Sequence, residues 1–99
     1  MPKYEIKQEF SGKTASECYQ ACLRAVPLAG YRIVKRRDIA SLVICEGRIE
    51  GNRVDLSMIV PMGKPTHVVL TLSSESADEV SLKEEAERVM GMMGEQLIR

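Results

Sequence analysis

The side chains in this sequence best suited to metal chemistry are its three cysteines and its one histidine. Cys18 and Cys22 are four positions apart, which places both on one side of a helix, and Cys45 faces the core in the strand pairing described below. His67 falls on the opposite face of that sheet, so a fourth ligand for zinc or copper is missing. Structural zinc sites also favour short spacings in loops, and free cysteines ordinarily pack as small hydrophobic residues. We therefore expect three core thiols and no metal site.

Methionine is the second residue type with chemistry to offer, because its thioether binds soft metals and adapts to varied ligands. Met58, Met90 and Met93 fall between the last predicted helix and the sheet. Methionines also fill irregular gaps in a hydrophobic core. Core packing is the first interpretation. The alternative is a small-molecule or lipid carrier with a pocket lined by these three residues.

A run of positive charge lies on a strand expected at the edge of the sheet. Charged residues on an edge strand commonly prevent pairing with another chain, and the alternative is weak binding of RNA or another anion. The formal net charge is +0, and the chain has one Phe, three Tyr and no Trp, so it lacks the basic excess and the aromatic residues that nucleic-acid binding favours. We expect edge protection and disfavour nucleic acid as a partner. The run consists of Arg32, Lys35, Arg36 and Arg37.

Catalytic signals are absent from the sequence. His67 has no nucleophile motif, orienting carboxylate or glycine-rich loop beside it. The sequence therefore predicts a non-catalytic protein without a cofactor.

The composition is that of an ordinary globular protein. The chain has 99 residues, of which 44% are hydrophobic and 28% charged, so we expect one domain over residues 1–99 with a real core. No apolar run approaches the roughly 20 residues that cross a bilayer, and the first residues lack a signal-peptide hydrophobic region. An odd number of cysteines without scaffold spacing indicates reduced thiols. We expect a cytoplasmic protein that does not enter a membrane.

Capping signals predict two helices. Thr14 with Glu17 three positions later forms a capping box, and the helix that begins there is expected to end just before Pro27. Ser81 with Glu84 forms a second capping box, from which a helix is predicted to run to the end of the chain. Residues 73–80, before that helix, are expected to be the least structured.

The central feature is a hairpin over residues 41–60, with a type II′ turn expected at Gly51-Asn52. This turn pairs Glu50 with Arg53 and Arg48 with Asp55. Because side chains alternate across a sheet, the pairing sorts them onto two faces. The face that carries apolar residues throughout must meet the core; its members are Val43, Cys45, Ile49, Val54, Leu56, Met58 and Val60.

Three further strands are predicted at residues 4–10, 31–37 and 67–72 from their alternation of apolar and polar residues. The order β-α-β-β-β-β-α favours a two-layer α+β fold with a five-stranded antiparallel sheet, strand order 1-5-4-3-2, and both helices on one face. This element order resembles the TATA-binding-protein-like and helix-grip topologies. Gly91 and Gly94 inside the last helix indicate a close approach to the sheet.

The opposite face of the sheet is unusual because apolar residues also gather there. A clustered apolar patch with a charged rim commonly marks a contact surface. We therefore expect a small module that acts by association with itself, as a homodimer, or with another protein. The patch would consist of Val34, Leu42, Ile44, Ile59 and Val69, and its rim of Lys7, Arg32, Arg36 and Glu46.

Overall fold

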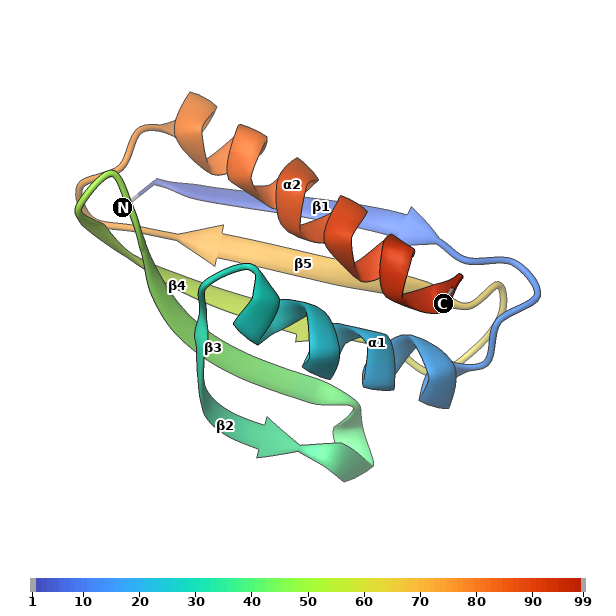
Figure 1. The fold of residues 1–99 in the computed structure, drawn as a ribbon. Coiled ribbons are helices and arrows are strands. Elements are labelled where there is room, and N and C mark those ends of the chain that lie inside the picture. Colours follow the sequence, from blue (N-terminus) through green and yellow to red (C-terminus); the bar gives the residue numbers. More distant parts are fainter. Residues whose placement is uncertain (1, 99) are drawn as a thin grey trace.

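The computed structural model describes residues 2–98. Its elements are β1 (Lys3–Glu9), α1 (Ala15–Leu28), β2 (Arg32–Arg37), a 3-10 turn (Asp38–Ala40), β3 (Leu42–Ile49), β4 (Asn52–Ile59), β5 (His67–Ser73) and α2 (Glu79–Leu97). The strands form a five-stranded antiparallel sheet in the order β1-β5-β4-β3-β2. Both helices lie side by side on one face of this sheet (Figure 1). The predicted two-layer α+β fold is confirmed.

Helix α1 begins where its capping box predicts. Thr14 Oγ1 accepts a hydrogen bond from the backbone N–H of Glu17 at 3.1 Å, and Glu17 Oε1 accepts one from the N–H of Thr14 at 3.0 Å. The predicted end before Pro27 is wrong, because this proline lies inside the last turn and the helix continues to Leu28. A proline there removes a single N–H donor. The chain leaves the helix at Gly30, whose φ of +95° is accessible to glycine.

Helix α2 begins earlier than predicted. Asp78 is the N-cap, and its carboxylate accepts a hydrogen bond from the N–H of Ser81 at 2.7 Å, so Ser81 is a residue of the first turn. Of residues 73–80, which were expected to be the least structured, Ser73 belongs to β5 and Glu79 and Val80 to α2, while residues 74–78 lie in neither a helix nor a strand. Ser74 Oγ donates to the carbonyl of Arg53 at 2.8 Å and accepts from the N–H of Ala77 at 3.0 Å.

The central hairpin turns one residue earlier than predicted. Glu50 and Gly51 have φ values of 50° and 85°, and Ile49 pairs with Asn52. The partner of every β3 residue is therefore displaced by two positions, which preserves the face on which each side chain lies. The predicted core face is correct. The predicted pairs Glu50/Arg53 and Arg48/Asp55 are wrong, because Arg48 lies opposite Arg53.

The space between the helices and the sheet is filled by one cluster of buried side chains. Tyr31 packs against the backbone of Gly47, where a Cβ atom would lie 2.7 Å from the ring. The Tyr31 hydroxyl donates to Glu85 Oε2 at 2.7 Å, and Arg88 donates to the same carboxylate and to the carbonyl of Ala29. These contacts tie β2 and β3 to α2.

The two helical glycines do not have the role expected from the sequence. A Cβ atom on Gly91 would meet nothing within 4 Å, and one on Gly94 would make an ordinary contact with Phe10 at 3.8 Å. The close approach that requires a glycine occurs at Gly47, in the sheet.

Candidate functional site

The open face of the sheet, opposite the helices, carries the predicted apolar patch. The strand registers place Leu42, Ile59 and Val69 side by side in one row across β3, β4 and β5. Arg37 ends this row on β2, and Lys7 ends it on β1. The row therefore has an apolar middle and a positive charge at each edge.

A second row completes the patch. Ile44 lies next to Ser57, which lies next to Thr71. Val34 lies at an irregularity of β2 between Ile33 and Lys35, where it is not paired with a β3 residue, and it is 54% exposed. Four of the five predicted patch residues thus come together in two neighbouring rows and are half-buried, and Val34 lies on the adjoining strand β2. We call this surface the outer patch; it consists of Val34, Leu42, Ile44, Ile59 and Val69.

The rim of the outer patch differs from the prediction at one position. Because of the irregularity in β2, Arg36 pairs with Val43, a core-face residue, while Lys35 pairs with Ile44 and Arg37 with Leu42. Arg36 instead binds Asp38, whose carboxylate also accepts a hydrogen bond from the Tyr19 hydroxyl at 2.7 Å. These hydrogen bonds, from Tyr19 and then from Arg36, lower the pKa of Asp38. Lys35 and Arg37 therefore stand where Arg36 was expected.

The three methionines proposed to line a ligand pocket are core residues. Met58 and Met93 are 0% exposed, and Met90 is 1% exposed. They belong to the cluster that fills the space between helices and sheet.

The cysteines also lie in the core. Cys18 and Cys22 are 0% exposed and Cys45 is 1% exposed, and all are free thiols. His67 lies at the start of β5, where its Nδ1 atom is 3.1 Å from the carbonyl oxygen of Pro65. Within residues 2–98, no three His, Cys, Asp or Glu side chains are grouped to hold a metal ion. None of the helices in that range is long and apolar enough to cross a bilayer.

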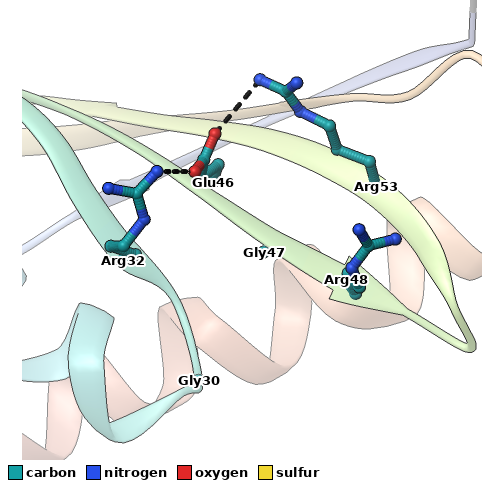
Figure 2. A pocket seen from close by; sticks show the side chains of 6 residues that line it. All are labelled: Gly30, Arg32, Glu46, Gly47, Arg48 and Arg53. Carbon is teal, nitrogen blue, oxygen red and sulfur yellow. Dashed lines mark hydrogen bonds and ion pairs between the residues drawn. The ribbon is translucent and has the colours of Figure 1, made fainter.

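A group of arginines near the hairpin turn was not anticipated from the sequence. Arg32, Arg48 and Arg53 line a hollow together with Glu46, Gly30 and Gly47 (Figure 2). Glu46 accepts hydrogen bonds from Arg32 and, at 3.2 Å, from Arg53. The bond from Arg32 and the positive charges nearby lower the pKa of Glu46. Of the predicted basic run, only Arg32 lines this hollow. The three arginines come together because of the register between β2, β3 and β4, which the sequence pattern did not predict.

Comparison with known proteins identifies the fold and no family. No protein-family model matches the chain, and no curated protein sequence matches it. The structure is similar to the crystal structure of TTHA0849 from Thermus thermophilus, with a TM-score of 0.58 and 12% identity over 98% of this chain and 97% of that chain. It is also similar to the crystal structure of Ara h 8.0201, with a TM-score of 0.49 and 8% identity over 97% of each chain. The similarity to TTHA0849 agrees with the α+β fold described above, and an identity this low says nothing about the protein's activity.

Proposed function

We propose that this protein is a non-catalytic module that acts by self-association through the outer patch. The observation that carries the proposal is the row Leu42, Ile59, Val69, which is apolar across three adjacent strands on a face that no helix covers. Burying such a row against a second copy removes apolar surface from water.

The position of the row suits a twofold axis. β4 is the central strand, so an axis along it would set Ile59 of one copy against Ile59 of the other and Val69 against Leu42. The same axis would place β1 of one copy over β2 of the other. Glu5 would then face Lys35, because both belong to the row that contains Ile44. In the row of Ile59 the same axis sets Lys7 against Arg37, a pair of like charges, so the apolar row and not charge complementarity carries the proposal.

The size of the molecule is compatible with such a dimer. Its two longer dimensions are 37 and 24 Å, and a stable interface needs about 800 Å² from each partner. One whole face of a molecule of these dimensions has an area of that order.

The decisive experiment compares Ile59→Glu with the unmodified protein by analytical ultracentrifugation over a wide concentration range. We expect a dimer for the unmodified protein and a monomer for Ile59→Glu, because the substitution sets two carboxylates against each other on the axis. Ile44→Glu should act in the same direction. Both variants should keep the far-UV circular dichroism of the parent, since their side chains lie outside the core.

Val80→Glu is the matched control. Val80 is 66% exposed at the start of α2, on the other layer of the fold, so the same change in charge should leave the dimer intact. A monomeric parent protein at high concentration would refute self-association.

A carrier for a small apolar molecule is the second candidate. Its support is that three adaptable side chains, Met58, Met90 and Met93, share the core between α2 and the sheet. These side chains fill their own space, so a ligand would have to displace them. Native mass spectrometry of the purified protein should then show a co-purified molecule, and its absence after mild isolation would count against the carrier.

A further inference from the structure

The hollow near the hairpin turn brings three arginines, Arg32, Arg48 and Arg53, around one space. It measures about 490 Å³ and lies where β2 begins. Pairing between β2 and β3 starts at Arg32 and Glu46, so the edge of β3 beyond Glu46 has no strand beside it. Gly30 and Gly47 line this hollow without side chains that would fill it.

Positive charge exceeds negative charge in the lining of the hollow. Arg48 and Arg53 lie directly opposite each other on neighbouring strands, and like charges in that position destabilise a sheet. Arg53 is compensated by Glu46 and Asp55, whereas Arg48 hydrogen-bonds the carbonyl of Gly51 and forms no ion pair within residues 2–98. Three guanidinium groups therefore share one lining carboxylate.

We propose that this hollow binds the phosphate group of a small phosphorylated molecule. Guanidinium groups offer paired N–H donors that match phosphate oxygens, and Arg48 has such donors free of any carboxylate. Glu46 acts as a positioning residue, because it holds Arg32 and Arg53 from two sides of the hollow (Figure 2).

A small molecule suits the hollow better than a nucleic acid does. No aromatic side chain lines it on which a base could stack. The chain carries no net positive charge that would attract a long polyanion. We therefore expect the hollow to contact one phosphate group and the atoms bonded directly to it.

The test is a titration followed by amide NMR chemical shifts at low salt, with inorganic phosphate, adenosine monophosphate and phosphatidylglycerol vesicles as separate probes. We expect saturable shifts at Gly30, Glu46 and Gly47 with at least one probe. Shifts with inorganic phosphate or the nucleotide indicate a soluble ligand, whereas shifts with the vesicles alone assign the same phosphate chemistry to a lipid headgroup. Absence of shifts with all three probes overturns the proposal.

Two variants distinguish binding in the hollow from a nonspecific attraction of anions to positive charge. Arg48→Gln should weaken binding about tenfold or more, because it removes a charge-assisted hydrogen bond to the anion. Arg37→Gln removes the same charge from the edge of the sheet outside the hollow, so it should leave the affinity nearly unchanged. Equal weakening by both variants, or tighter binding of an RNA oligonucleotide that also depends on Arg37, overturns the proposal. Ile59→Glu should bind the probes like the parent, which keeps this result independent of self-association.

Discussion

The two faces of the sheet use the same strands in opposite ways. On β5, Val68, Leu70 and Leu72 are 0% exposed beneath the helices, while Val69 and Thr71 between them remain half-buried on the open face. The covered face is filled by one cluster of buried side chains, and no buried side-chain nitrogen or oxygen within residues 2–98 lacks a hydrogen-bond partner. The open face instead combines an apolar row with arginines that face each other. The buried core therefore lies on the first face, and both of the binding surfaces that we propose lie on the second.

The largest expected effect contrasts neighbouring residues of β5. Leu70→Ala should lower the free energy of unfolding by about 2–5 kcal/mol, because it leaves a cavity in a filled core. Val69→Ala should cost about 1 kcal/mol or less, since its side chain lies on the open face. Urea unfolding at one protein concentration, followed by circular dichroism, measures both. Equal losses would contradict the assignment of the two faces.

The second prediction contrasts two glycines. Gly47→Ala should lower the free energy of unfolding by about 1–3 kcal/mol, because the new Cβ would lie 2.7 Å from the Tyr31 ring. Gly91→Ala should raise it by about 1 kcal/mol, because the position is in a helix with open space around it. Thermal or urea unfolding of the two variants checks the signs. A stable Gly47→Ala would mean that Tyr31 moves aside without cost.

Much of the fold follows from residue patterns alone. Alternation of apolar residues identifies the core face of the hairpin even though the turn is displaced by one residue, because moving each partner by two positions leaves parity unchanged. Cross-strand charge pairs depend on the register itself, so both predicted pairs failed. The start of α2 was also missed, because its N-cap is Asp78 and not Ser81, the residue that the sequence pattern indicated.

The two candidate sites differ in the same respect, since one depends on the sheet face and the other on the strand register. The outer patch was predictable because it depends only on which face each residue occupies. The arginine hollow was not, because it depends on which residues lie opposite one another and on where β2 begins. The irregularity at Val34 could not be predicted either, because no distinctive side chain marks the inserted residue. This irregularity is the reason that Arg36 does not lie on the open face.

A smaller effect is expected from the polar contact that crosses the core. Burial opposes ionisation of Glu85, but hydrogen bonds from Arg88 and Tyr31 outweigh it and lower the Glu85 pKa below its ordinary value of 4.5. The stabilisation from this carboxylate is therefore present above that value and is lost as the pH falls below it. Glu85→Gln should cost about 1 kcal/mol at neutral pH and should flatten the loss of stability in acid. A variant with the parent's acid profile would show that other carboxylates control it.

The smallest effect at neutral pH concerns the buried thiols. Burial raises the pKa of Cys22 and of Cys45 to about 12 each, from an ordinary value of 9.0. In the unfolded chain these thiols ionise near the ordinary value, so their contribution to stability is complete below pH 9.0 and is lost as the pH rises toward 12.

Two measurements check this assignment. The folded protein should react with a thiol reagent at about pH 8 only as fast as it opens, because the thiolate is the nucleophile. Cys22→Ala should make the fall in unfolding free energy above pH 9.0 less steep, even if the variant is less stable overall. Rapid labelling of Cys22 or Cys45 in the folded state would show that the covered face admits solvent, and the contrast between the two faces of the sheet would fail at its most buried residues.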